Sequence, residues 1–91
     1  MENIKQTNWE VYIIQTESGK LYTGISTDVE RRFNEHKTAD TPNSKAAKFF
    51  RANKPSKIIF REQHPNRSSA TKREMQIKGL LRQDKLALSN I

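Results

Sequence analysis

The feature that most constrains the fold is a pair of strand-like segments separated by a short turn. Residues 9–15 (WEVYIIQ) are rich in aromatic and β-branched side chains, and residues 20–25 (KLYTGI) continue in the same character. Between them, Glu17, Ser18 and Gly19 fit a three-residue hairpin loop whose last residue takes the left-handed conformation. The chain is therefore expected to begin its fold with an antiparallel hairpin.

The length of this loop decides which side chains share a face of the hairpin. With three loop residues, Tyr12 stands opposite Gly24 and Ile14 opposite Tyr22, so both tyrosines lie on one face together with Lys20. A two-residue loop would shift the register by one and separate the tyrosines. Two phenols and an ammonium group are unusual in a purely apolar core, although strand tyrosines commonly pack with only the hydroxyl at the edge.

The rest of the chain alternates between helical and strand patterns. The first helix is expected to begin at Thr27, which has capping-box spacing to Glu30, and to run to about Lys37. Prolines mark the breaks between the later segments. In chain order we expect a loop at 38–43, a helix at 45–52 capped by Ser44, a turn at 53–56, a strand at 57–62, and a helix from Ser68 or Ser69 to about Leu81 with one or two helical turns after it.

This order of elements, ββααβα, predicts an α+β fold with a small three-stranded antiparallel sheet flanked by helices. A chain of 91 residues is long enough for one small domain. We place that domain at residues 9–91, after a polar and flexible segment at residues 1–8.

Composition narrows the classes of function. There is no cysteine, which excludes disulfides and thiolate metal sites. Lysine and arginine number 17 against 10 acids, and the net charge of +7 favours a polyanionic partner, nucleic acid first. The longest apolar run, VYII, is far too short to span a membrane, so we expect a cytoplasmic protein with no membrane partner.

The adjacent arginines of the first predicted helix face different surroundings. Arg32 flanks the apolar face of the helix, whereas Arg31 lies nearly opposite, beside Glu35, with which it can pair. His36 follows on the same side as Arg32, one turn later. Taken singly, each has an ordinary explanation: Arg32 bonds helix-terminal carbonyls or an acid, and His36 is a packed core histidine.

The last predicted helix carries an acid in its apolar stripe. Ala70, Ile77 and Leu81 fall on one face, and Glu74 falls in the same stripe. An unpaired carboxylate facing a dry core costs several kcal/mol. Glu74 is therefore expected either to pair with a cation such as Arg32 or to bind a metal ion, and the pattern leaves both alternatives open.

These residues match a known family. The chain resembles the GIY-YIG nuclease superfamily, and most closely its small stand-alone members of the UPF0213 type. Residues 22–36 (YTGISTDVERRFNEH) are similar to the family signature, in which an arginine follows the second tyrosine by ten residues and a histidine comes four later. Residues 10–12 (EVY) stand at the first motif, and residues 73–74 (RE) stand on the acidic helix of the family.

The sequence departs from the family pattern at several positions. Glu10 and Val11 replace glycine and isoleucine in the first motif, and Thr23 replaces isoleucine in the second. The loop after His36 lacks a Gly-Lys-Gly run that many small relatives show. Asn90 is too near the end of the chain to stand for the asparagine that follows the acidic helix in larger members.

The resemblance implies divalent-metal-dependent hydrolysis of phosphodiester bonds in DNA, in a repair or recombination context. It assigns catalytic roles to Tyr12, Tyr22, Arg32, His36 and Glu74, with Glu74 as the ligand of Mg²⁺ or Mn²⁺. Arg32 would bind a non-bridging phosphate oxygen, and Tyr22 would orient the water or a phosphate. Tyr12 is the favoured general base, and His36 is the alternative. A tyrosine with a pKa of about 10 can act as a base at neutral pH only if nearby positive charge lowers that pKa.

Basic residues around the second predicted helix are candidates for phosphate contacts. They are Lys20, Lys45, Lys48, Arg51 and Lys54, and a solvated charged face is the plainer explanation. Two other functions remain open: a nucleic-acid-binding module that is non-catalytic or partner-dependent, and a basic domain that binds a protein. A transient dimer is a further option, because cutting a duplex takes two sites or two visits.

Overall fold

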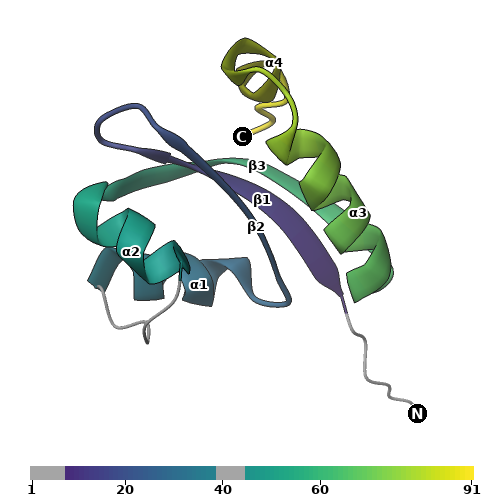
Figure 1. Cartoon of the computed structure of the whole chain (residues 1–91). Helices are drawn as coiled ribbons and strands as arrows, with labels where there is room; N and C mark the ends of the chain where they lie inside the picture. Colours follow the sequence, from purple (N-terminus) through teal and green to yellow (C-terminus); the bar gives the residue numbers. More distant parts are fainter. Residues whose placement is uncertain (1–7, 39–44) are drawn as a thin grey trace.

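A three-stranded antiparallel sheet lies between two helical layers in the computed structural model, which describes residues 8–38 and 45–91 (Figure 1). The expected α+β class and element order are confirmed, including a short helix at the end. All but one residue of the predicted flexible segment 1–8 and of the predicted loop 38–43, and the Ser44 cap, lie outside the described residues. The elements are β1 (Trp9–Thr16), β2 (Leu21–Ser26), α1 (Val29–Thr38), α2 (Lys45–Ala52), β3 (Pro55–His64), α3 (Arg67–Lys78) and α4 (Arg82–Ala87).

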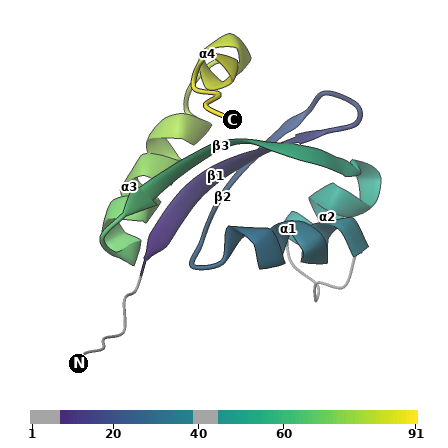
Figure 2. The same ribbon diagram turned by 180° about the vertical axis from the view of Figure 1, so that it is seen from behind.

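The sheet has the order β2-β1-β3, so β1 is the central strand. Helices α1 and α2 cover one face of the sheet and α3 covers the other, as the view from behind also shows (Figure 2). Residues 11–14 are at most 1% exposed. A strand covered on both faces is apolar along its length rather than alternating, which explains the run VYII. No helix in the described ranges is long and apolar enough to cross a bilayer.

Side chains of β1 alternate between two separate cores. Val11 and Ile13 pack against Ala70 and Ile77 of α3. Tyr12 and the residue two positions after it point to the other face of the sheet, into the core beneath α1 and α2. The tyrosine face and the α3 face are therefore distinct environments.

The predicted three-residue hairpin loop is confirmed. Tyr12 pairs with Gly24 and Ile14 with Tyr22, the register that puts both tyrosines on one face. Gly19 has φ of 88°, a backbone conformation that glycine adopts without strain. The Gly19 N–H donates to the Thr16 carbonyl at 3.0 Å and closes the turn.

The predicted cap of the first helix was wrong. Helix α1 begins at Val29, and the side chain of Asp28 rather than Thr27 accepts the backbone N–H three residues later, at 3.1 Å. Glu30 does not complete a capping box, because its carboxylate pairs with Arg61 of β3. Arg61 also forms a two-pronged pair with Glu10, with both N–O distances at 2.8 Å. A partner distant in sequence thus takes the acid that the local pattern assigned to the cap.

The last long helix is shorter than predicted. It is capped by Asn66, whose side chain accepts the Ser69 N–H at 2.8 Å, and it ends at Lys78. Gly79 follows, and glycine has low helix propensity. Leu81 is consequently outside α3 and 66% exposed, so the expectation that it completes the buried stripe was wrong.

The two edges of the sheet differ. Strand β3 is longer than the predicted 57–62, and Pro55 is tolerated as its first residue because this is an edge strand. Asn90 covers that edge: its N–H donates to the Ile59 carbonyl at 2.9 Å, and its side chain bonds both backbone groups of Arg61. Asn90 thus has a structural role at this edge. Within the described residues, no strand pairs with the outer edge of β2.

Candidate active site

The ring of Tyr12 lies directly over Gly24. A Cβ atom on Gly24 would come within 2.6 Å of the Tyr12 hydroxyl oxygen and 2.8 Å of its ring carbon Cζ. Only glycine leaves room for the ring at this place. Tyr12 starts on the central strand, so its ring reaches over β2 and its hydroxyl lies at Gly24.

Tyr22 stands beside Tyr12 on the same face. The two ring centroids are 6.3 Å apart, and Tyr22 also packs on Phe50 at 4.9 Å and on Phe49 at 5.5 Å. Both phenylalanines belong to α2. Helix α2 therefore forms a wall that fixes the position of the second phenol.

The charges of Arg32 and Glu74 both act on the two tyrosine hydroxyls. Burial, and then Tyr22, raise the pKa of Tyr12 above its ordinary value, whereas Arg32 lowers it through its charge and a hydrogen bond to the hydroxyl. The pKa of Tyr22 is raised by burial and lowered by Arg32. Glu74 raises the pKa of both phenols. Four side chains from β1, β2, α1 and α3 thus share one site.

Glu74 enters this site from the opposite layer of the molecule. Helix α3 packs on the other face of the sheet, against β1 and β2. A carboxylate on α3 can influence hydroxyls on the tyrosine face because the outer edge of β2 has no partner strand among the described residues. The site therefore lies where the two layers meet at this edge.

The ion pair between Glu74 and Arg32, one of the two alternatives that the sequence left open, does not form in the described structure. Glu74 Oε2 lies 3.4 Å from Lys78 Nζ, and Arg32 Nη1 donates to Glu35 Oε1 at 3.1 Å. Each residue thus has a partner on its own helix, since α1 and α3 lie on opposite faces of the sheet. Arg31 is the solvated arginine, as expected, with a side chain 63% exposed beside Glu35.

His36 is sealed within the wall of the site. It is 2% exposed, stacks on Phe50 at 4.2 Å and meets the Tyr22 ring edge-on at 5.9 Å. Neither ring nitrogen has a hydrogen-bond partner among the described residues. Burial, followed by the charge of Arg32, lowers the pKa of His36 to about 4, against an opposing effect of Glu35. The imidazole is therefore neutral at pH 7 and shielded from water.

The donor set suits a hard divalent cation rather than a closed protein cage. The described residues contain no group of three or more His, Cys, Asp or Glu that could hold a metal ion. Glu74 offers one carboxylate, 18% exposed, next to two phenol oxygens. Mg²⁺ and Mn²⁺ accept one or two carboxylates and complete their shells with water and phosphate oxygens. The residues present fit such an ion.

The basic residues named from the sequence whose side chains the structure describes are exposed, and none of them acts on the pKa of either tyrosine. Helix α2 turns Ala46, Ala47 and Phe50 inward, which leaves its other face to solvent. The side chain of Lys45 lies outside the described part of the chain. Lys48, Arg51, Lys54 and Lys20 are exposed, and Lys20 lines a cleft next to the hairpin.

Sequence reasoning missed two supports of this site. Phe49 and Phe50 hold Tyr22 and His36, and their only signal was an apolar pair on a short helix. Arg61 ties α1 to the sheet through Glu10 and Glu30, which are 51 and 31 residues away from it in sequence. No local pattern could have revealed that network.

Comparison with known proteins agrees with the fold and with the resemblance inferred from the sequence. The GIY-YIG catalytic domain family matches residues 8–87. A UPF0213 protein of Photorhabdus laumondii is 39% identical over 80 residues, covering 88% of this chain and 72% of that protein. Another, from Pectobacterium carotovorum, is 40% identical over 84 residues, covering 92% and 80%. The solution NMR structure of a UPF0213 protein from Bacillus halodurans superposes with a TM-score of 0.53 at 30% identity, covering 89% of this chain and 81% of that one.

Proposed function

This chain belongs to the GIY-YIG catalytic domain family, and we propose that it is a divalent-metal-dependent endonuclease that hydrolyses phosphodiester bonds in DNA. The observation that carries the proposal is the convergence of Tyr12, Tyr22, Arg32 and Glu74 at one open edge of the sheet. A domain that served only as a structural scaffold would have no need to bring a cation and an acid to one buried and one half-buried phenol.

Arg32 is the phosphate-binding group of the proposed mechanism. Its charge acts on the Tyr12 hydroxyl, and its side chain is 31% exposed, so a substrate oxygen can reach it. A guanidinium donates in a fixed fork that suits phosphate oxygens, and its charge stabilises the negative charge that builds up in phosphoryl transfer. Its pair with Glu35 orients it from the same helix.

Glu74 is the proposed metal ligand. When bound, Mg²⁺ or Mn²⁺ would supply positive charge that stabilises the scissile phosphate and the leaving 3′ oxygen and lowers the pKa of the neighbouring phenols. Glu74 now pairs with Lys78, whose flexible ammonium group can give way to a cation of higher charge. The Glu74 side chain is 18% exposed, so it is partly open to solvent.

Tyr12 is the favoured proton acceptor, but its hydroxyl can take this role only when its pKa is lowered. Burial outweighs Arg32 and holds the hydroxyl protonated at neutral pH in the free protein. Lys20 lies on the same face but does not contribute to lowering this pKa. Tyr12 hydrogen-bonds the attacking water in either protonation state, but it can accept a proton only once more positive charge is nearby.

His36 and Tyr22 take positioning roles in this proposal. A histidine with 2% exposure and a ring stacked on Phe50 does not reach a water at the open edge. It instead fixes the Tyr22 ring, whose hydroxyl orients the water or a phosphate oxygen. The net charge of +7 supports a polyanionic substrate. The choice of DNA over RNA, and a role in repair or recombination, follow the family resemblance alone.

The test is cleavage of end-labelled branched, single-stranded and duplex DNA with Mg²⁺ or Mn²⁺. Glu74→Gln keeps the size of the side chain and removes its charge. We expect wild type to cut at least one substrate and Glu74→Gln to lose at least about 100-fold in rate, in the range typical of a lost charge-stabilising group.

Glu62→Gln is the matched control for this experiment. Glu62 also bears a carboxylate on the α3 side, where it accepts from Arg73 at 3.0 Å, and it does not contribute to the pKa of either tyrosine. The control should cut like wild type. Equal cutting by Glu74→Gln and wild type would refute the role of Glu74 and the site proposed around it. Salt-sensitive DNA binding without cutting by any form would favour the binding module instead.

A further inference from the structure

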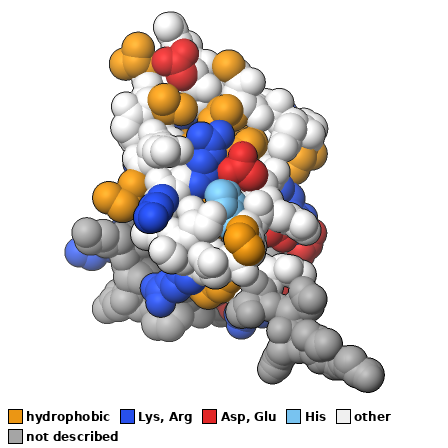
Figure 3. Space-filling model, turned by 90° about the vertical axis from the view of Figure 1, so that its right-hand side faces the viewer, with side chains coloured by type: hydrophobic (Ala, Val, Ile, Leu, Met, Phe, Trp, Pro, Cys, Tyr) orange, Lys and Arg blue, Asp and Glu red, His pale blue; other side chains and the backbone are white. Residues whose placement is uncertain are grey.

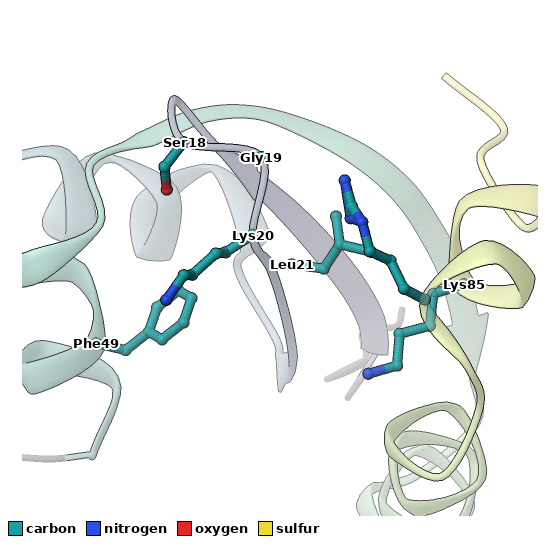
Figure 4. Close-up of a pocket in the computed structure, with 7 residues that line it drawn as sticks. Ser18, Gly19, Lys20, Leu21, Phe49 and Lys85 are labelled. Carbon is teal, nitrogen blue, oxygen red and sulfur yellow. The ribbon is translucent and has the colours of Figure 1, made fainter.

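A cleft of about 490 Å³ lies between the tip of the β1–β2 hairpin, helix α2 and helix α4. Figure 4 shows Lys20 and Phe49 on one side of the hairpin and Lys85 approaching from α4 on the other. Its volume lies in the range of sites that hold small ligands or parts of larger ones. The lining residues are Ser18, Gly19, Lys20, Leu21, Phe49, Arg82 and Lys85.

Three of the lining residues are cations without an acidic partner. Lys20, Arg82 and Lys85 form no ion pair with any carboxylate of the described residues, whereas Arg31, Arg32, Arg61, Arg73 and Lys78 all do. Among the residues that the structure describes, no acid lines the cleft. Uncompensated positive charge concentrated in a concave surface attracts anions.

Helix α4 and the tip of the hairpin position these cations. Arg82 and Lys85 are three residues apart on α4 and so project to the same side of the helix. A Cβ on Gly19 would lie 3.6 Å from Arg82 Nη2, so the guanidinium rests against the hairpin tip. Elsewhere the charge is mixed: on the side face shown in Figure 3, basic side chains alternate with acidic and apolar ones.

The cleft adjoins the tyrosine site along the same open edge of the sheet. Lys20 and Tyr22 lie on one face of the hairpin, two residues or about 7 Å apart along the strand. Phe49 lines the cleft and packs on Tyr22 at 5.5 Å, so one ring forms part of both walls. Leu21 adds an apolar surface between Lys20 and the helix α4 side.

We propose that this cleft binds the backbone of the nucleic-acid strand next to the cleaved bond. Arg82 and Lys85 each contact a backbone phosphate on the α4 side of the hairpin, Lys20 contacts a further one on the Phe49 side, and Leu21 and Phe49 contact the sugars between them. The inference rests on the proposed function, because it extends a substrate strand from the site at Tyr22. It adds Arg82 and Lys85 to the binding surface and makes α4 part of the functional domain.

The test measures binding of a fluorescent oligonucleotide by anisotropy in EDTA, where no metal-dependent cutting occurs, across roughly 50 to 200 mM salt. The double variant Arg82→Gln/Lys85→Gln removes both α4 cations. We expect an affinity about tenfold or more below wild type and a salt slope smaller by about 2, one for each lost phosphate contact.

The matched control is Arg67→Gln/Lys72→Gln, which removes the same charge from α3, away from the cleft. Both of its side chains are exposed. It should keep the salt slope of wild type to within less than one. Equal losses in the two double variants would mean that only net charge matters, and would overturn the inference.

A second measurement uses unmodified protein and does not depend on how the variants fold. In amide NMR spectra, adding the oligonucleotide should shift the signals of Gly19, Lys20 and Lys85. Shifts confined to other regions overturn the inference, and so does an equal response to inorganic phosphate at the same phosphate concentration, which would indicate a free-anion site. If wild type shows these shifts but does not cut DNA, the proposed nuclease activity is rejected and the cleft stands as a binding site alone.

Discussion

The two faces of the sheet carry opposite kinds of core. Under α3, Val11, Ile13, Ala70 and Ile77 are all 0% exposed and wholly apolar. Under α1 and α2, the same strand contributes a phenol, and a histidine with 2% exposure has no hydrogen-bond partner among the described residues. One strand thus supplies side chains to both cores. Only the core under α3 is wholly apolar, as protein cores usually are.

The difference indicates a division of labour. Burying apolar surface stabilises the fold, whereas burying unpaired polar groups costs free energy. Proteins tend to break such rules where function demands it. The α3 face should therefore govern stability and the tyrosine face should govern chemistry, and this assignment can be tested by substituting each face in turn.

The largest effect is expected on the tyrosine face. Arg32→Gln removes the charge that acts on both hydroxyls and should lower the cleavage rate about 100- to 1,000-fold. The free energy of unfolding should fall by no more than about 1 kcal/mol, because the lost ion pair is partly exposed. Cleavage by initial rate and unfolding in urea measure the two quantities on one sample.

The neighbouring arginine provides the control. Arg31→Gln makes the same change one residue earlier, at a side chain 63% exposed. It should leave cleavage within about twofold of wild type and stability within about 0.5 kcal/mol. Equal loss of activity in the two variants would mean that helix charge, rather than the placement of Arg32, is what matters.

A core substitution on the α3 face should show the reverse pattern. Ile77→Ala leaves a cavity beside Ala70 and should lower the free energy of unfolding by about 2 to 5 kcal/mol. Cleavage per folded molecule, measured well below the unfolding midpoint, should stay within a few-fold of wild type. A loss comparable to that of Arg32→Gln would show that the two faces are not separable.

The tyrosine face also contributes a pH dependence of stability, through His36. Its pKa in the folded protein is about 4, below the ordinary value of about 6.5, so between these values the unfolded chain binds more protons. Stability from this group is complete above about pH 6.5 and is lost as pH falls towards 4, by about 3 kcal/mol in total. Unfolding in urea at pH 7.5 and 4.5 measures this loss.

His36→Leu removes this titrating group while keeping an apolar side chain against Phe50. Its stability should fall by about 3 kcal/mol less than that of wild type between the two pH values. An equal fall in both proteins would mean that His36 titrates normally and is not held neutral by burial.

Local rules predicted the parts of the structure that depend on near neighbours. The three-residue loop fixed the pairing of Tyr12 with Gly24, and helical periodicity separated Arg31 from Arg32. Both follow from geometry within a few residues. The family signature added the expectation that Glu74 joins them, and the charge of Glu74 does act on both phenols.

Features that depend on tertiary structure were predicted poorly. Periodicity placed Glu74 in an apolar stripe with Leu81, but Gly79 ends the helix first and Leu81 is exposed. The sequence also could not show that α1 and α3 lie on opposite faces, which is why Arg32 pairs with Glu35 instead of Glu74. Contacts between layers depend on the whole sheet, and no single segment encodes them.

The most direct test of the account is the cleavage rate of Tyr12→Phe. Phenylalanine keeps the ring over Gly24 and removes only the hydroxyl, so the fold should lose no more than about 1 kcal/mol. If this hydroxyl takes part in the chemistry, cleavage should fall about 100- to 10,000-fold. Cleavage at the wild-type rate by the folded variant would contradict the account, because the phenol would then be no more than part of the core.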